Sequence, residues 1–247
     1  MNAFSFTAAD FTEARYCELL KATAARFRFV GLEDDLTKDG IALWRHDIDI
    51  SPHRALKLAR LEAELNIRSI WFVMLASPFY NIFEPNVAAL IRNISALGHD
   101  IGLHFDPPAM ANSEAAIEAC LLRQADILSD LIELPVRSFS LHNPTVHPKR
   151  NLQGRVHAGL SNASAPFLYS TFSYCSDSNG IWRFRQLHEV IADPATRSLY
   201  ALTHPVWWTP EEMAPRARVK RAIEGRAAAV LADYDALLAN NGRSNVK

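Results

Sequence analysis

The sequence predicts an α/β fold built on a mostly parallel sheet, either open or closed into a barrel. Short apolar runs alternate along the chain with amphipathic stretches, and strand–helix–strand alternation of this kind produces parallel sheets. Polar side chains follow four of the apolar runs. The chain has 247 residues, 49% of them hydrophobic, and no repeat or polar linker divides it. We therefore expect a single domain over residues 1–247.

The first half of the chain predicts buried strands separated by helices. Residues 8–25 have a helical pattern, within an N-terminal helical extension over residues 1–30. The expected strands are Ile41–Leu43, Ser69–Leu75, Asp100–Leu103 and Arg137–Leu141. Three helices are expected between them: one from the N-cap Ser51 with Pro52 in its first turn, one from near Pro85 to Gly98, and one over about 113–132.

The second half is less regular. Residues 142–166, rich in Asn, Pro, Ser and Gly, predict a long loop, and loops of this length in compact domains are usually functional. The expected strands are Phe167–Tyr174, Ile181–Phe184, Leu187–Ile191 and Ser198–Thr203. Thr209-Pro210-Glu211-Glu212 fits a capping box for a C-terminal helix over 210–241, with Pro215 separating its first turn from the rest.

The composition excludes several classes of function. The 26 basic and 27 acidic residues give a net charge of −1, without the basic excess of a general nucleic-acid binder. The three cysteines form no CxxC pair, which favours a reducing compartment over a disulfide framework. No signal peptide or membrane-spanning run is recognisable. We expect a cytoplasmic protein with no nucleic-acid partner and no membrane span.

Carboxylates and imidazoles collect at the ends of four predicted strands. The first strand leads into Asp47 and Asp49, the third into His104, the fourth into His142 and the last into His204. Because the C-terminal ends of parallel strands meet at one edge, where ligands bind in α/β folds, these side chains should lie together. The alternatives are aspartates that cap the following helix and a hydrogen-bonded core histidine at position 104.

This pattern favours a metal site. Asp47 and Asp49 share a face of an extended segment, and a divalent cation would relieve their repulsion. His104 lies on one face with Gly102, which is expected to leave open space, and a strand-end imidazole beside carboxylates is a common metal ligand. Asp106 would ligate or orient an imidazole. Of His142 and His204, either could be the third ligand and the other a general acid.

The remaining polar and aromatic candidates have weaker support. His46 faces away from Asp47 and should be structural, and surface or packing roles are expected for His53, His147, His157 and His188. Cys17 and Cys120 should be buried thiols, and Cys175 should lie near the mouth of the site without activation. An aromatic wall for a sugar ring, with core packing as the alternative, is predicted from Trp207, Trp208, Tyr80, Phe105, Tyr174 and Trp182.

Several motifs in this order resemble those of the NodB-type polysaccharide deacetylases. They are RHDIDISPHRALKLARLEAELNIRSIWFV, ALGHDIGLHFD, SLHNP, YCSDSNGIWR and LTHPVWW, and they extend over about residues 40–210. The sequence is most similar to a divergent branch, polysaccharide deacetylase-like proteins often encoded with surface polysaccharide or O-antigen genes. The resemblance implies a distorted (β/α) barrel of seven or eight mostly parallel strands. It also implies a divalent metal, with zinc as the first candidate and cobalt, nickel or manganese as others.

The resemblance also implies roles for individual residues. Asp47 corresponds to the general base and Asp49 to a metal ligand, although the two could be exchanged. His104 corresponds to the first metal-binding histidine. Pro108 stands where the family has its second, so His142 is the best substitute and Asp106 the next. His204 in Leu202-Thr203-His204 corresponds to the general acid, and Asp177 to the acid that orients a catalytic partner.

The function implied is a metal-dependent hydrolase that removes an acyl group, foremost N-acetyl, from a sugar of a surface polysaccharide or its precursor. A cytoplasmic location would favour a nucleotide-linked or lipid-linked precursor. Another amide or formamide hydrolase on the same metal site is one alternative. An inactive carbohydrate-binding relative, motivated by Pro108, is the second. A partner-binding α/β domain is the third and leaves the strand-end histidines unexplained.

Overall fold

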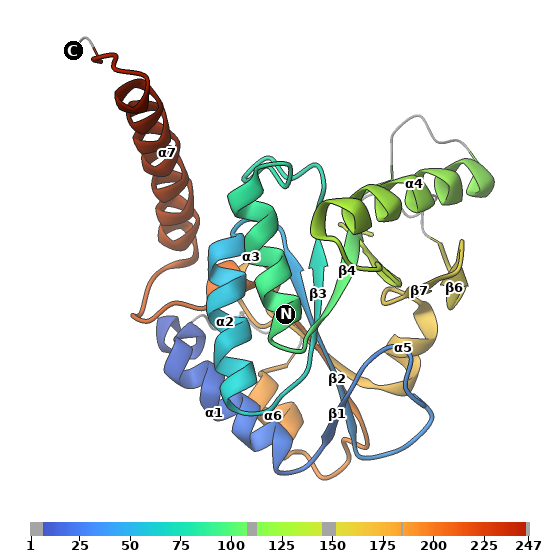
Figure 1. The fold of residues 1–247 in the computed structure, drawn as a ribbon. Coiled ribbons are helices and arrows are strands. Elements are labelled where there is room, and N and C mark those ends of the chain that lie inside the picture. Colours follow the sequence, from blue (N-terminus) through green and yellow to red (C-terminus); the bar gives the residue numbers. More distant parts are fainter. Residues whose placement is uncertain (1–6, 108–112, 145–151, 184, 246–247) are drawn as a thin grey trace.

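The chain folds around a curled sheet of mostly parallel strands (Figure 1). The computed structural model describes residues 7–107, 113–144, 152–183 and 185–245. The strand order is β6-β7-β5-β4-β3-β2-β9-β8, with β1 also paired to β2. Every pairing is parallel except β6 with β7. The strands are β1 (Arg28–Val30), β2 (Ile41–Ile48), β3 (Ile70–Val73), β4 (Asp100–Phe105), β5 (Ser138–Leu141), β6 (Val156–His157), β7 (Leu160–Asn162), β8 (Ser173–Ser176) and β9 (Leu199–Thr203).

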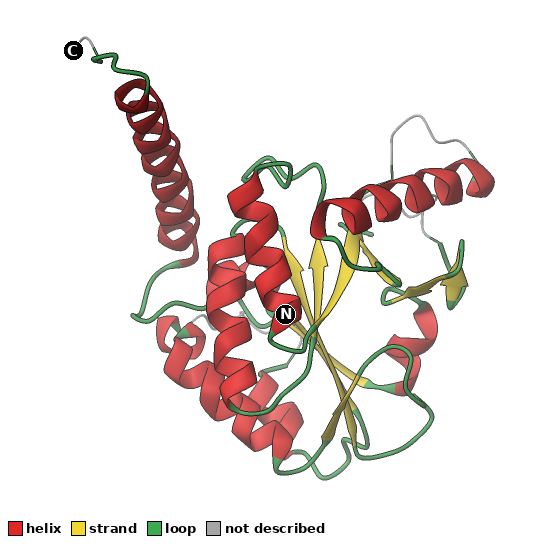
Figure 2. Cartoon of the chain, in the orientation of Figure 1, coloured by secondary structure: helices red, strands yellow, loops and turns green. Residues whose placement is uncertain are grey.

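Helices pack along this sheet (Figure 2). They are α1 (Glu13–Ala24), α2 (Pro52–Glu64), α3 (Pro85–Ala96), α4 (Glu114–Ile132), α5 (Pro166–Thr171), α6 (Leu187–Ala192) and α7 (Pro215–Asn240). The two edge strands, β6 and β8, do not pair with each other within the described ranges, so the barrel stays open. The predicted fold class, a distorted (β/α) barrel of mostly parallel strands, is confirmed, although the described sheet has nine strands instead of seven or eight. No helix in the described part of the chain has the length and apolar character to cross a bilayer.

The central strand β2 is longer than the predicted Ile41–Leu43. All eight of its residues are buried, because β3 and β9 flank it and side chains cover both of its faces. The strand continues through the polar residues Arg45, His46 and Asp47. A prediction based on apolar runs ends the strand too early, at the point where its functional side chains begin.

The capping predictions for α2 and α3 are confirmed. Ser51 caps α2 by accepting a hydrogen bond from the Arg54 amide, with Pro52 in the first turn. Helix α3 begins at Pro85, and the chain leaves it through Gly98, whose φ of +96° suits glycine. Helix α2 therefore starts directly after the C-terminal end of β2, which places its first turn near the predicted site, whereas residues 74–84 separate β3 from α3.

Three predicted strands in the second half are wrong in whole or in part. Leu187–Ile191 is the helix α6, which a capping box between Gln186 and Glu189 starts. Most of Phe167–Tyr174 is the helix α5, and the strand β8 begins at Ser173. The described part of Ile181–Phe184, residues 181–183, forms no strand either. Short apolar runs do not distinguish a buried strand from a short helix, and here the capping residues decide.

Three other boundaries also differ from the prediction. The described part of the 142–166 loop contains β6 and β7. The N-terminal segment contains a helix, α1, and also the strand β1, which pairs with β2; Tyr16 and Leu20 of α1 are buried in the core. No capping box forms at Thr209, because its hydroxyl donates a hydrogen bond to the Glu211 carbonyl. Helix α7 begins at Pro215, so this proline lies in the first turn and does not separate that turn from the rest of the helix. From there α7 projects away from the body (Figure 1).

A buried polar cluster joins β2 to the helices behind it. The Glu62 carboxylate accepts hydrogen bonds from Tyr16, His46 and Ser69, and both side chains of the Glu62–His46 pair are fully buried. His46 Nδ1 in turn bonds the Thr203 hydroxyl at 2.6 Å. Burial alone would raise the pKa of Glu62, but the neighbouring His46 imidazole outweighs it and lowers that pKa. His46 is therefore structural, as predicted.

Replacing Glu62 with Gln should lower the free energy of unfolding by about 3 kcal/mol at pH 7, because it breaks a buried charge-assisted cluster. Glu64→Gln, an exposed position in the same helix, is the control. A carboxyl with a lowered pKa stabilises the fold above its ordinary pKa, so the difference should disappear as the pH falls below the carboxyl range. Urea denaturation measures both. Equal unfolding free energies for the two variants at pH 7 would contradict the role of Glu62.

Candidate metal centre and active site

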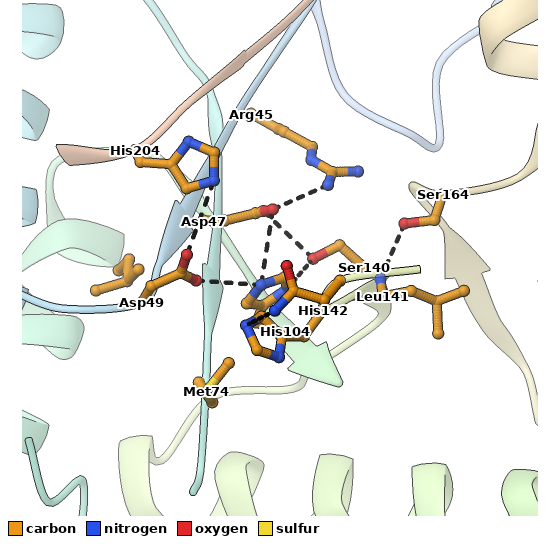
Figure 3. Close-up of polar contacts among 12 residues, drawn as sticks. Arg45, Asp47, Asp49, Met74, His104, Ser140, Leu141, His142, Ser164 and His204 are labelled. Carbon is orange, nitrogen blue, oxygen red and sulfur yellow. Dashed lines mark hydrogen bonds and ion pairs between the residues drawn. The ribbon is translucent and has the colours of Figure 1, made fainter. Parts of the chain in front are cut away.

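Side chains from four strand ends meet at the C-terminal edge of the sheet (Figure 3). Asp47 lies in β2 and Asp49 just after it, His104 lies in β4, His142 follows β5 and His204 follows β9. Because β2 is flanked by β3 and β9, and β4 by β3 and β5, the pairing order brings these ends to one edge. The juxtaposition that the sequence predicted is present.

Asp49, His104 and His142 form a cluster suited to a metal ion. Each offers one ligand atom, and these atoms all lie within 4.8 Å of one another. His104 Nε2 is 3.2 Å from Asp49 Oδ1, and the two imidazole rings are 5.2 Å apart between centroids. Asp49 Oδ1 is shielded from solvent, yet it accepts no hydrogen bond from the described residues. A shielded carboxylate oxygen that faces the His104 imidazole nitrogen at 3.2 Å, and that no other described group binds, fits a metal ligand.

Ser140 fixes the tautomer of His104 in the form that a metal needs. The Ser140 hydroxyl lies 2.7 Å from His104 Nδ1 and 3.3 Å from Asp47 Oδ1. The hydroxyl has one proton, and the Asp47 carboxylate can only accept it, so His104 Nδ1–H donates to Ser140. His104 Nε2 then carries the lone pair and faces Asp49. Sequence analysis missed Ser140. Its position in β5 directly beside His104 in β4 follows from the strand register, which the sequence alone does not give.

The electrostatics of the cluster favour a cation. Burial alone would lower the pKa of His104, but the carboxylates of Asp47 and Asp49 raise it above its usual value. Burial would raise the pKa of Asp49, yet the imidazoles of His104 and His204 bring it to about 2. Both carboxylates are therefore ionised at neutral pH. The field that favours a protonated imidazole at this point also favours a divalent cation.

Asp47 is held in place by a residue that sequence analysis did not select. Arg45 Nη2 donates to Asp47 Oδ2 at 2.9 Å, and both side chains are almost completely buried. Arg45 Nη1 also donates to the Tyr200 hydroxyl at 2.7 Å. Burial would raise the pKa of Asp47, but the Arg45 guanidinium outweighs it and lowers that pKa. The two-residue spacing of Arg45 and Asp47 on one strand face was the available signal.

His204 and Asp177 form a hydrogen-bonded pair next to Asp49. His204 Nδ1 lies 2.6 Å from Asp177 Oδ1, and His204 Nε2 lies 3.8 Å from Asp49 Oδ2. Asp177 is fully buried and also accepts from the Trp208 indole at 2.9 Å. Burial alone would lower the pKa of His204, but the Asp177 carboxylate raises it to about 9. His204 is therefore protonated at neutral pH and oriented by Asp177.

His142 lies in the cluster, and Asp106 lies beside it. His142 Nδ1 is 3.6 Å from Asp106 Oδ2, and the Asn143 amide donates to His142 Nε2 at 2.9 Å. Asp106 is exposed and is not part of the three-residue cluster, so its position beside Nδ1 suits orientation of His142 rather than ligation. A metal on His142 Nε2 would replace the Asn143 amide as the partner of that nitrogen. Pro108 lies outside the described residues.

Two predictions about the surroundings of the site are wrong. Trp208 is fully buried and packs on Phe11 and Trp182, with ring centroids 5.2 and 5.9 Å apart, and Trp207 is also buried. Among the other proposed wall residues, Tyr80 and Phe105 are buried as well. These aromatic rings belong to the core, which was the alternative interpretation.

Gly102 leaves no open space. A Cβ at this position would lie 2.4 Å from the Phe72 ring and 2.7 Å from the Ser138 hydroxyl. The glycine therefore permits side chains of β3 and β5 to pack closely against β4 instead of opening a ligand cavity.

The other histidines and the cysteines lie outside the cluster. His53 and His188 are exposed, and His147 falls outside the described residues. His157 is buried: its Nδ1 pairs with Glu118 at 2.7 Å and its Nε2 accepts from the Gly154 amide, so both ring nitrogens are used. Cys17 and Cys120 are half-buried instead of buried. Cys175 is buried, which raises the pKa of its thiol to about 12 and leaves it unreactive.

Comparisons with known proteins place the chain beside carbohydrate esterases of family 4 only distantly. No family model and no curated protein matches it. Similar solved structures include a family 4 carbohydrate esterase from Bacillus anthracis, with 15% identity and a TM-score of 0.43, covering 87% of this chain and 86% of that one. They also include a chitin deacetylase from the fungus Colletotrichum lindemuthianum, with 15% identity and a TM-score of 0.46, covering 77% and 84%.

A family 4 pseudoenzyme from Bacillus anthracis is similar as well, with 10% identity and a TM-score of 0.46. The match covers 77% of this chain and 63% of the pseudoenzyme, so the present chain spans less than two thirds of that protein.

Proposed function

We propose that this protein is a metal-dependent hydrolase that removes an acyl group, foremost N-acetyl, from a sugar of a surface polysaccharide or its precursor. One observation carries the proposal: the cluster of Asp49, His104 and His142 lies beside a buried carboxylate, Asp47, and an imidazole, His204. A metal-ligand set flanked by an acceptor and a donor of protons is what hydrolysis of an amide requires. The sugar substrate and the surface polysaccharide context rest on the sequence resemblance.

The three ligand side chains would hold the metal. One carboxylate and two imidazoles suit zinc, and three protein ligands leave the open position of a catalytic site. Cobalt, nickel or manganese could bind the same donors. When bound, a divalent metal lowers the pKa of water and polarises an acyl oxygen.

The residues beside the cluster supply the proton transfers. Asp47, ionised and held by Arg45, would accept the proton of the attacking water. His204, protonated on Nε2 because Asp177 holds Nδ1–H, would donate a proton to the leaving nitrogen. Carboxylate and imidazolium are both in the required state at neutral pH, since the pKa of Asp47 is lowered and that of His204 is about 9.

Replacing Asp177 with Asn should leave metal binding unchanged and lower kcat about a hundredfold, because His204 loses the carboxylate that orients it and stabilises its charge. The amide keeps the size of the side chain and a partner for the Trp208 indole. Asp126→Asn, an exposed position in α4, is the matched control. Zinc stoichiometry measures metal binding, and the rate of acetate release measures kcat. Unchanged kcat in Asp177→Asn would remove the pair from the mechanism.

The proposal is tested with the purified chain loaded with zinc. We expect one zinc per chain by elemental analysis and release of acetate from N-acetylated amino sugars. Treatment with a chelator should abolish release, and added zinc should restore it. Release of formate from an N-formyl sugar but no acetate would favour the alternative amide hydrolase. Sugar-dependent thermal stabilisation without metal and without hydrolysis would favour the carbohydrate-binding relative and overturn the proposal.

A further inference from the structure

A basic cavity adjoins the proposed active site. It has a volume of about 330 Å³, and its wall comes from the first turn of α2, the loop before α3 and the first half of α7. Ser51, in that wall, is two residues beyond Asp49, so at most about 7 Å of extended chain separates the wall from the backbone of the metal cluster. Val206, two residues after His204, also lines it. The cavity and the proposed active site therefore share two loops.

The charged side chains in the wall are all basic. Arg54, Arg218, Arg221 and Arg226 line the cavity together with His53, and no acidic residue is among the lining residues that the structure describes. Three of the arginines pair with a carboxylate outside the wall: Arg54 with Glu13, Arg221 with Glu211 and Arg226 with Glu84. Arg218 has no such partner in the described part of the chain.

Arg218 is a buried guanidinium with an unused donor. It is 1% exposed, Nε donates to the Thr209 hydroxyl at 3.3 Å, and Nη2 donates to the Ala8 carbonyl at 3.1 Å. Its Nη1 is buried and has no hydrogen bond with any described residue. Burial, followed by the neighbouring Arg221, lowers the pKa of Arg218 to about 10. The Phe11 ring, 5.5 Å from the guanidinium carbon, compensates part of this charge. Because no described carboxylate pairs with Arg218 and its Nη1 donor is unused, the position favours an anionic ligand.

Two further groups point the same way. Arg54 Nε is also buried without a hydrogen bond from the described residues. The cavity contains the first turn of α2, a helix of 13 residues, whose N-terminal end attracts anions. The apolar residues Phe79 and Val206 complete the wall and would contact an uncharged part of the ligand.

We propose that this cavity is a phosphate-binding subsite and that the substrate of the adjoining site is a phosphorylated sugar derivative. A guanidinium fork matches phosphate oxygens, and the double charge of a phosphate suits several arginines better than a single carboxylate. The statement about the substrate rests on the proposed hydrolase function, whereas phosphate binding does not. The phosphate could belong to a nucleotide carrier or a lipid carrier, which share this chemistry.

Phosphate binding is tested by calorimetric titration of the full chain with pyrophosphate and with uridine diphosphate N-acetylglucosamine. Arg221→Gln should weaken binding about tenfold, because it removes a cation from the wall. Lys220→Gln removes the same charge from the same helix outside the wall and should change affinity less than about twofold. No measurable binding by the unaltered chain, or equal losses in the two variants, would overturn the subsite.

Arg218→Lys tests the buried donor, with thermal unfolding as a check on folding. We expect loss of binding in a folded variant; if the variant does not fold, the Arg221→Gln comparison decides.

A preference for uridine diphosphate over pyrophosphate indicates a nucleotide carrier, and binding to vesicles that contain an isoprenoid phosphate indicates a lipid carrier. For the substrate, kcat/KM should be higher for the phosphorylated sugar than for free N-acetylglucosamine, and Arg221→Gln should remove the difference. Phosphate binding without hydrolysis of either sugar would contradict the hydrolase function and leave the subsite intact.

Discussion

Replacing His104 with Ala should weaken zinc binding by more than about a hundredfold. Loss of a partner that merely orients a metal ligand costs 10–100-fold in affinity, and here a ligand itself is removed. His104 is buried in β4 and its Nε2 faces Asp49, so no other side chain in the described ranges replaces it at that point. Elemental analysis after dialysis and competition with a chromophoric chelator measure stoichiometry and affinity.

His188→Ala is the control for this experiment, because it removes an exposed histidine outside the cluster. It should leave one zinc per chain. The loss of His104 also creates a small cavity next to Ser140, so thermal unfolding must show that the variant is folded. A folded His104→Ala protein with unchanged zinc affinity would mean that the metal, if any, binds elsewhere and that the proposed centre is wrong.

The position of this centre was predictable because it follows from a simple periodicity. Strand ends in a parallel sheet meet at one edge, so a sequence that puts Asp49, His104 and His142 after three apolar runs already places them together. No knowledge of loop conformation is needed for that inference. The fold class was predictable for the same reason, since alternation of strand and helix fixes the layers.

The groups that hold the site in place were less predictable. Arg45 and Ser140 are polar residues inside strands, and patterns based on apolar runs treat such residues as strand ends. The role of Ser140 depends on which strands are neighbours and in which register, which the sequence pattern does not define. The contact of Arg45 with Asp47 lies within β2, where their two-residue spacing was the signal. Patterns based on apolar runs also predict a strand for Leu187–Ile191. The segment is a helix, because Gln186 and Glu189 form a capping box at its start.

The basic cavity depends entirely on tertiary contacts. Arg54 comes from α2, and Arg218, Arg221 and Arg226 come from α7, more than a hundred residues later. Each arginine alone has the pattern of an ordinary surface charge. The burial of Arg218 and its unused Nη1 donor distinguish this cluster from a solvated helix face.

Replacing Asp47 with Asn should leave zinc bound and lower kcat about a thousandfold. The amide cannot accept the proton of water, and general-base catalysis contributes about 10²–10⁴-fold. Asparagine keeps an oxygen for the Arg45 guanidinium, so the buried pair loses its charge but not its hydrogen bond. Acetate release measures turnover, and elemental analysis measures zinc in the same preparation.

Asp49→Asn is the matched comparison, because it makes the same chemical change two residues away. If Asp49 is the ligand and Asp47 the base, the Asp49 variant loses zinc and the Asp47 variant keeps it. The reverse result would exchange the two roles, an alternative that the sequence left open. The distances favour the present assignment, because His104 Nε2 lies 3.2 Å from Asp49 Oδ1 and 3.7 Å from Asp47 Oδ2. Turnover retained in Asp47→Asn with zinc in place would show that neither assignment describes the proton acceptor. Arg45 would then neutralise a structural carboxylate, and the base would have to be a different group facing the metal ligands.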